Sequence, residues 1–213
     1  MEAGQKFNRF TAKELVDLEK ILNVLPDTRP KETVTDTYNN GFEKDGPVYQ
    51  MIMKKIYPKI NDVVTENFEL SCGFILKANE PYGIHTDYWH AHDKRKNVVG
   101  PSVLIPLSVS PDTANITDTH TVIFDQICTD NFQEFKKNNK PIADVNNSAV
   151  YLKETILSHC SADDLSYLTV KSVCSWEPGS FLYWDRRLLH SSDSFGTSGI
   201  KQKRCIVMFF DEK

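Results

Sequence analysis

The first third of the chain carries hydrophobic residues at a helical period. Apolar positions recur every three or four residues over residues 11–25 and again over residues 47–67. Pro47 opens the second stretch at a position where proline favours a helix, and Pro58 interrupts that stretch. The pattern predicts two helices, which we expect to pack on one face of a sheet as a helical buttress formed by residues 1–67.

From residue 68 the hydrophobic period changes to two. Apolar and polar residues alternate through residues 68–76, which predicts a strand with one apolar face. Pro106 lies inside another candidate strand and places it at a sheet edge or at a bulge. Many short strands separated by turns predict a mainly β fold with N-terminal helices, a double-stranded β-helix of the jelly-roll, cupin-like type. The further strands are predicted over residues 103–109, 120–124, 168–176, 180–184 and 204–210.

The predicted β-helix core spans residues 68–211 and forms, with the helical buttress, a single domain over residues 1–213. A polar insertion interrupts it at about residues 127–167, where short helices are predicted near residues 131–137 and 153–160. Insertions beside a site often carry substrate contacts, although a surface excursion without a role fits the sequence equally well.

Three residues in this pattern have the chemistry of a metal site. His85 and Asp87 are two positions apart, which on a strand places both side chains on the same face. His190 follows the Pro178-Gly179 turn and lies where the next apolar strand is expected to end. Two imidazoles and one carboxylate on one side of an iron leave the other side open for substrates. The alternative is structural, with His85 at a strand end and His190 as a hydrogen-bonded core residue.

The ordered set of these features resembles the 2-oxoglutarate- and Fe(II)-dependent dioxygenases, over roughly residues 68–211. The resemblance implies that His85, Asp87 and His190 are the catalytic ligands of Fe(II) and that 2-oxoglutarate is the cosubstrate. It also implies that dioxygen is consumed and that succinate and CO2 are released. The expected reaction is hydroxylation of an unidentified small-molecule or side-chain substrate.

The same resemblance implies a cation that binds the far carboxylate of 2-oxoglutarate. Arg204 follows His190 by a short loop, at the start of the last predicted strand, and its guanidinium can grip a carboxylate with two hydrogen bonds. Lys201 and Lys203 are rivals for this role, because some members of the family use lysine.

One position departs from the family pattern. Some members carry a serine two residues after the arginine, and Ile206 stands there in this chain. A second contact to the cosubstrate must therefore come from elsewhere. Tyr82, shortly before His85, is the expected cofactor-binding residue, and simple packing is its alternative role. Ser102 and Tyr183 are weaker candidates.

Other polar residues near the motif have weaker support. His90 and His92 lie in a charged stretch that indicates a solvated loop, so no ligand role is expected for them. Trp89 would share the face of Asp87 and either line the pocket or pack in the barrel. Asp185 is a candidate for orienting a nearby group, while Arg186 and Arg187 either contact an anionic substrate or form structural ion pairs. His120 and His159 are interpreted as structural or surface residues.

Composition narrows the possible partners and location. The 25 basic and 29 acidic residues give a net charge of −4, so stable nucleic-acid binding through phosphate contacts is not expected. The five cysteines are odd in number and include no C-x-x-C pair, which favours free thiols in a reducing, cytoplasmic location. No signal peptide or membrane span is expected, because no sufficiently long apolar run occurs.

Two other functions fit the same sequence. A cupin-like isomerase or epimerase could use Zn or Mn with the same three ligands, and a non-catalytic β-barrel binding module would need no metal. The prime substrate of a dioxygenase is left open by the sequence.

Overall fold

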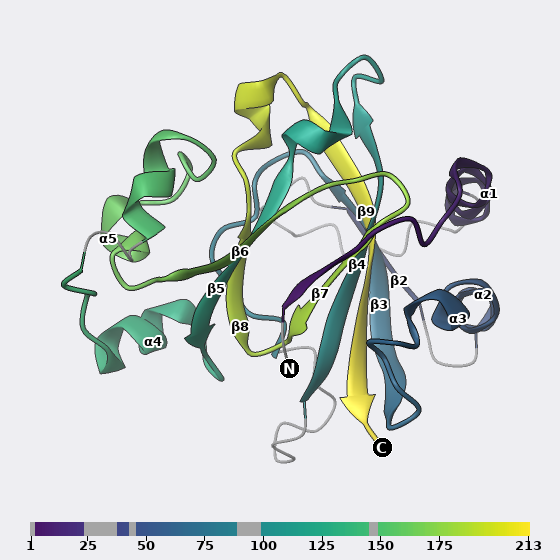
Figure 1. The fold of residues 1–213 in the computed structure, drawn as a ribbon, viewed down its shortest axis with the longest axis horizontal. Helices are drawn as coiled ribbons and strands as arrows, with labels where there is room; N and C mark the ends of the chain where they lie inside the picture. Colours follow the sequence, from purple (N-terminus) through teal and green to yellow (C-terminus); the bar gives the residue numbers. More distant parts are fainter. Residues whose placement is uncertain (1–2, 24–37, 43–45, 89–98, 145–148) are drawn as a thin grey trace.

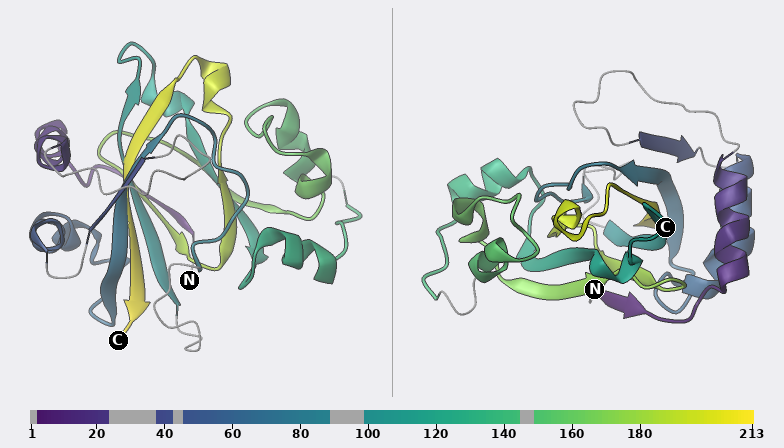
Figure 2. Two further views of the ribbon diagram at one scale, coloured as in Figure 1. Left: turned by 180° about the vertical axis from the view of Figure 1, so that it is seen from behind. Right: turned by 90° about the horizontal axis from the view of Figure 1, so that it is seen from above.

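Two antiparallel sheets face each other, with helices on their outer sides (Figures 1 and 2). This computed structural model describes residues 3–23, 38–42, 46–88, 99–144 and 149–213. The larger sheet has the order β1 (Gly4–Lys6), β7 (Phe181–Asp185), β4 (Val99–Ser110), β9 (Gln202–Glu212), β3 (Phe68–Ala78) and β2 (Tyr38–Phe42). The smaller sheet has the order β6 (Val170–Ser175), β5 (His120–Ile127) and β8 (Leu188–Ser192). The predicted mainly β, jelly-roll class is confirmed.

The central strands of the larger sheet are bent by bulges. In β4 the register with β9 shifts between Pro106 and Ser108, so the bulge expected at the proline is present. The alternative of an edge strand is wrong, because β4 lies between β7 and β9. Proline has no backbone N–H to donate, and the bulge interrupts the ladder where that hydrogen bond would be needed.

A second bulge changes which residues of β3 share a face. The register with β9 shifts between Leu70 and Cys72. Leu70 packs toward the helices, whereas Phe74 and Leu76 pack between the two sheets. The single apolar face predicted for residues 68–76 is therefore wrong, since one extra residue reverses the alternation of every side chain beyond it.

Helices α1 (Ala12–Asn23), α2 (Pro47–Lys55) and α3 (Tyr57–Ile60) cover the outer face of the larger sheet (Figure 2). Thr11 and Glu14 cap α1 reciprocally, since each backbone N–H donates to the other's side chain. The shared core contains Leu15, Leu18, Ile52, Ile56, Ile60, Ile75, Ile206 and Met208. The packing face predicted for the buttress is therefore present.

The leading segment is nevertheless not wholly helical. It also supplies the edge strands β1 and β2 to the larger sheet. The second helical stretch ends at Ile60 rather than continuing toward residue 67. Short strands such as these carry too little alternation to be separated from loops by pattern alone.

The insertion after β5 covers the outer face of the smaller sheet. It contains α4 (Phe132–Asn138), the 3₁₀ helix η4 (Ala149–Glu154) and α5 (Ala162–Leu165). The helix predicted near residues 131–137 is confirmed, but residues 155–161 join η4 to α5 without a helix of their own. The core beneath the insertion includes Val122, Phe124, Leu152, Leu157, Leu165 and Leu189. The insertion therefore packs against the sheet instead of extending into solvent.

All five cysteines are free thiols, as expected, and four of them are buried. In the part of the chain that the structure describes, no helix combines the length and the apolar character that crossing a membrane requires.

Candidate metal centre

The segment that carries His85 and Asp87 is not the strand that the sequence predicts. Among the described residues, it forms one isolated bridge, in which His85 and His190 exchange backbone hydrogen bonds of 3.0 and 2.9 Å. The Asp87 N–H then donates to the carbonyl of Arg186 at 3.0 Å. These bonds fix both residues against β8 and the turn before it, so the two side chains still converge although the segment is irregular.

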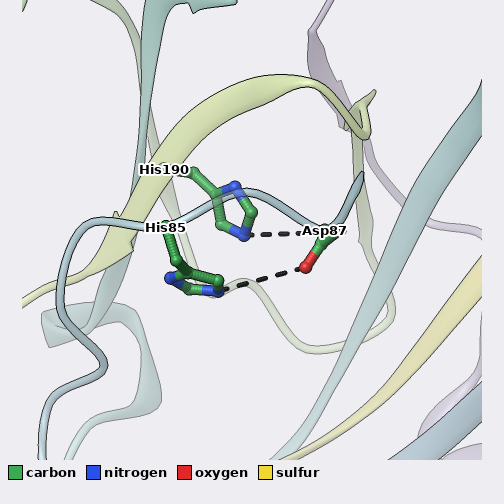
Figure 3. Close-up of side chains that lie close together, drawn as sticks. All are labelled: His85, Asp87 and His190. Carbon is green, nitrogen blue, oxygen red and sulfur yellow. Dashed lines mark ion pairs between the residues drawn. The ribbon is translucent and has the colours of Figure 1, made fainter. Parts of the chain in front are cut away.

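His85, Asp87 and His190 lie together, with one ligand atom from each within 4.8 Å of the others. The Nε2 of His190 is 3.5 Å from Asp87 Oδ2, and the Nε2 of His85 is 3.9 Å from Oδ1 (Figure 3). Metal bonds of about 2.1 Å place ligand atoms about 3 Å apart on one face, so a small closure would bring all three onto one ion. The structure thus brings the three predicted ligands together.

Backbone carbonyls set the tautomer of both histidines. His85 Nδ1 is 2.7 Å from the carbonyl oxygen of Gly83, and His190 Nδ1 is 3.1 Å from that of Leu188. Each Nδ1 therefore donates its proton, and each Nε2 is left with a lone pair toward Asp87. With both rings neutral, two lone pairs and a carboxylate face one another, so the site attracts positive charge, either as a proton or as a metal ion. This donor set fits a divalent metal of the Fe(II) type.

Asp87 is held by two neutral donors. Ser102 Oγ donates to its Oδ2 at 2.5 Å and Trp184 Nε1 donates at 3.1 Å. Burial acts to raise the pKa of the Asp87 carboxyl, but the rings of His190 and His85 and the Ser102 hydroxyl outweigh burial and hold this pKa below its ordinary value. The carboxylate is therefore ionised and oriented before any ligand arrives.

His190 responds to the same carboxylate. Burial acts to lower the pKa of His190, but the charge of Asp87 and the hydrogen bonds around the ring raise it above its ordinary value. A proton therefore binds this metal-free site more readily than it binds a free histidine, because it supplies the positive charge that the carboxylate attracts.

Arg186 holds the backbone of Asp87 from behind. Its side chain is fully buried, and Nε and Nη2 each donate to the Asp87 carbonyl at 3.4 Å. Nη1 pairs with the Asp211 carboxylate, and the guanidinium lies 5.2 Å from the centre of the Phe209 ring. Of the two roles considered for Arg186, the structure places it in an ion pair. No pattern in the sequence indicates that its partner is the Asp87 carbonyl.

The other residues of this turn are also engaged in structural contacts. Asp185 accepts from the Nε and Nη2 of Arg187 at 2.9 and 2.7 Å. Ser102, considered as a cosubstrate contact, instead bonds Asp87. Tyr183 packs on the helical side of the larger sheet.

A cavity of about 150 Å³ lies between the sheets and is bordered by the three clustered residues. Most of its lining is apolar, and Lys203 is the one lysine or arginine among the described lining residues. The lining consists of Phe74, Leu76, Ala78, Tyr82, His85, Asp87, Leu104, Thr121, Trp176, Trp184, His190, Ser192, Lys203, Cys205, Val207 and Phe209. The cavity can enclose a small molecule beside a metal.

Arg204 does not reach this cavity. Its side chain lies on the opposite face of β9, where Nη1 is 3.4 Å from Glu19 of α1. Neighbouring residues of a strand point to opposite faces, so Lys203 enters the cavity and Arg204 meets the helices. The assignment of the cosubstrate cation to Arg204 is corrected by this geometry. Both faces of β9 are apolar, so the alternation could not decide between them. Lys201, the other rival, is exposed.

Lys203 belongs to a buried polar cluster. Its Nζ donates to Asp193 Oδ1 at 3.0 Å, to Thr119 Oγ1 at 3.1 Å and to the His120 carbonyl at 3.2 Å. It also lies 4.3 Å from the centre of the Trp176 ring. Burial lowers the pKa of Lys203 below its ordinary value, although Asp193 acts to raise it. His120, interpreted as structural from the sequence, is part of this cluster.

Tyr82 and His159 are the remaining candidates in the part of the chain that the structure describes. Tyr82 lines the cavity, and its ring centre is 4.9 Å from that of His85. Burial raises the pKa of the Tyr82 hydroxyl, so this group stays protonated. His159 bonds the hydroxyls of Ser194 and Ser191 at 2.7 and 3.2 Å and has a structural role. The predictions for Trp89, His90 and His92 lie outside the described residues.

Several solved structures are similar to this chain. The non-heme alpha ketoglutarate dependent epimerase SnoN from nogalamycin biosynthesis matches with a TM-score of 0.59 at 8% identity, over 99% of this chain and 78% of its own. A Pseudomonas putida prolyl-4-hydroxylase matches with a TM-score of 0.53 at 12% identity, over 99% and 92% of the two chains. A Burkholderia pseudomallei oxidoreductase of the 2OG-Fe(II) oxygenase family matches with a TM-score of 0.55 at 12% identity, over 98% and 84%.

No protein-family model matches the sequence, and the search of curated proteins gives no match. At such low identities the structural likeness concerns the fold. The chain therefore has the jelly-roll fold found in 2OG-Fe(II) oxygenases, with a His-Asp-His cluster on the wall of its cavity.

Proposed function

We propose that this protein is an Fe(II)- and 2-oxoglutarate-dependent dioxygenase that oxidises a C–H bond, with hydroxylation as the reaction. The observation that carries the proposal is the convergence of His85, Asp87 and His190 on the wall of a cavity that also contains a buried lysine. The fold of the chain supports the same function, since enzymes with this chemistry share it.

His85 and His190 would hold Fe(II) through Nε2, and Asp87 would hold it through its carboxylate. When bound, the metal with 2-oxoglutarate and dioxygen supplies the oxidising power for C–H cleavage. The chain contributes order and shielding. The Gly83 and Leu188 carbonyls hold both rings in the metal-binding tautomer, and apolar walls exclude water from the reacting groups.

We assign the far carboxylate of 2-oxoglutarate to Lys203 and not to Arg204. Lys203 is 3% exposed and lines the cavity, whereas Arg204 faces α1. A buried carboxylate needs a charged partner to offset its loss of hydration, and Lys203 is the cation that the described lining offers. Tyr82 is the proposed second contact, because its residue belongs to the same lining and its hydroxyl remains protonated.

The prime substrate is proposed to be a small molecule that presents an apolar, uncharged group to the metal. Phe74, Leu76, Leu104, Val207 and Phe209 form the apolar walls of the cavity. The similar SnoN structure holds Fe3+, alpha ketoglutarate and nogalamycin RO, so this fold accommodates a small molecule beside both. The five free thiols support a cytosolic location.

Anaerobic reconstitution tests the proposal. Wild-type protein with Fe(II) and 2-oxoglutarate should develop a weak visible charge-transfer band, and oxygen should then release succinate. Asp87→Ala, treated identically, should show neither signal. Metal binding without a band or succinate would favour a metal isomerase, and absence of metal binding would favour a binding module.

A further inference from the structure

The ammonium of Lys203 has no donor left for a ligand. A protonated lysine carries three N–H groups. Three acceptors surround Nζ at hydrogen-bonding distance, namely the Asp193 carboxylate, the Thr119 hydroxyl and the His120 carbonyl. A carboxylate that enters the cavity can bond to Lys203 only if one of these acceptors gives up its hydrogen bond.

Of the three acceptors, Asp193 is the one least able to give up its hydrogen bond to Lys203. Its Oδ2 accepts from the backbone N–H of His120 at 2.7 Å and lies 3.3 Å from the His120 ring nitrogen. Its own N–H donates to the His120 carbonyl at 3.2 Å. Asp193 is 2% exposed, so no path to solvent opens for its side chain. Both carboxylate oxygens of Asp193 are therefore held, Oδ1 by Lys203 and Oδ2 by the His120 N–H.

The pair is also electrically balanced. Asp193 Oδ1 lies 3.0 Å from Nζ, and both side chains are 3% exposed. A second carboxylate approaching Lys203 meets an ion pair with almost no net charge, together with the repulsion of Asp193. In a buried site this repulsion is only weakly screened by solvent.

We propose that Asp193 is a specificity-determining residue that competes with the cosubstrate for Lys203 and thereby sets a low affinity for 2-oxoglutarate. The inference rests on the proposed function, because it assumes that the far carboxylate binds at Lys203. Asp193 stabilises the cavity wall by neutralising a buried ammonium, and the cosubstrate must displace part of that interaction when it binds.

The test is the affinity of the Fe(II)-loaded protein for 2-oxoglutarate, measured by anaerobic titration, in the wild type and in Asp193→Asn. The variant should bind at least about tenfold more tightly, which corresponds to about 1.4 kcal/mol. Its metal-free form should melt at a lower temperature than the wild type, because Lys203 loses its counter-charge. Addition of 2-oxoglutarate should raise its melting temperature more than that of the wild type.

Two controls make this result specific. Asp125→Asn removes another aspartate that is 3.0 Å from a lysine, Lys171, but on the surface, and it should leave 2-oxoglutarate affinity unchanged. 2-Oxobutyrate has the 2-oxo acid group but lacks the far carboxylate. It should therefore bind the wild type and Asp193→Asn equally well.

Thr119→Val provides a second variant if Asp193→Asn does not fold. It frees one N–H of Lys203 without changing any charge, so 2-oxoglutarate should bind about two- to threefold more tightly by the hydrogen bond released. Unchanged or weaker binding in the folded variants would overturn the competition while leaving the proposed function intact. Absence of 2-oxoglutarate binding in the wild type and in every variant would overturn both.

Discussion

The cavity contains two polar clusters that differ in how their charges are balanced. Around Lys203 each N–H has an acceptor and the charge is balanced by Asp193. At the other cluster, the Nε2 atoms of His85 and His190 lie 3.9 and 3.5 Å from the Asp87 carboxylate, which draws positive charge toward the rings. The first cluster carries its own counter-charge, whereas the second attracts a proton or a metal ion.

The two clusters therefore differ in how they respond to a ligand. A metal at the His-Asp-His cluster supplies the positive charge that the Asp87 carboxylate attracts, so its binding is favoured by the site itself. A carboxylate at Lys203 replaces an existing bond, so its binding is opposed. Substitutions that alter one cluster at a time should therefore separate metal binding from carboxylate binding.

Asp87→Ala should abolish Fe(II) binding and turnover. Asp87 is the single anionic member of its cluster. Its loss should therefore weaken metal affinity by more than the roughly 10–100-fold expected when a residue that only orients a ligand is lost. Ser102 and Trp184 also lose their acceptor, which should cost about 1–3 kcal/mol of folding free energy. Iron affinity by titration and unfolding by denaturant check the two effects. Wild-type iron affinity would remove Asp87 from the site.

Lys203→Met and Arg204→Met form a matched pair, since the residues are neighbours on opposite faces of β9. Lys203→Met should weaken the binding of 2-oxoglutarate by about 2–5 kcal/mol, because it removes the charged partner of a buried carboxylate. It should also destabilise the protein by about 3–5 kcal/mol, since Asp193 is left as an unpaired buried charge. Arg204→Met should leave 2-oxoglutarate affinity unchanged. The opposite ranking in an anaerobic titration would return the role to Arg204.

These two residues show how far the sequence could predict the site. The spacing of His85 and Asp87 and the position of His190 identified a cluster that the structure brings together, because residue chemistry and order are visible in the sequence. The choice between Lys203 and Arg204 depends on the facing of β9, and apolar residues occupy both of its faces. Hydrophobic alternation therefore carried no information there.

The fold shows the same division. The change of period near residue 68 predicted helices followed by a β-rich jelly roll, which is what forms. The bulge after Leu70 was not predictable, because the alternation of apolar and polar residues continues through it without a break. The role of Arg186 was also hidden, since its partner is a backbone carbonyl on a segment that is distant in the sequence.

Arg186→Lys should weaken the affinity for Fe(II) by about 10–100-fold, as expected for a residue that positions a metal ligand. A lysine cannot reproduce the two donors that hold the Asp87 carbonyl. Arg187→Lys is the matched control, because Arg187 pairs with Asp185 instead. The measurement is iron affinity beside thermal stability. Equal iron affinity in the two variants would make Arg186 purely structural.

The smallest predicted effect concerns pH. The lowered pKa of Asp87 gives stability that is present above about pH 4 and lost as pH falls, whereas the raised pKa of His190 gives stability that is present below about pH 6.5 and lost as pH rises. Metal-free protein should therefore lose stability as the pH rises from about 6.5 through the raised pKa of His190. Urea unfolding of wild type and His190→Gln checks this, and an equal loss in both would contradict it.

The most direct measurement is a crystal structure of the protein soaked anaerobically with Fe(II) and 2-oxoglutarate, with iron located by its anomalous signal. We expect one iron, bonded at about 2.1 Å to His85, Asp87 and His190, and the far carboxylate of 2-oxoglutarate against Lys203. Iron bound elsewhere, or a carboxylate paired with Arg204, would contradict it.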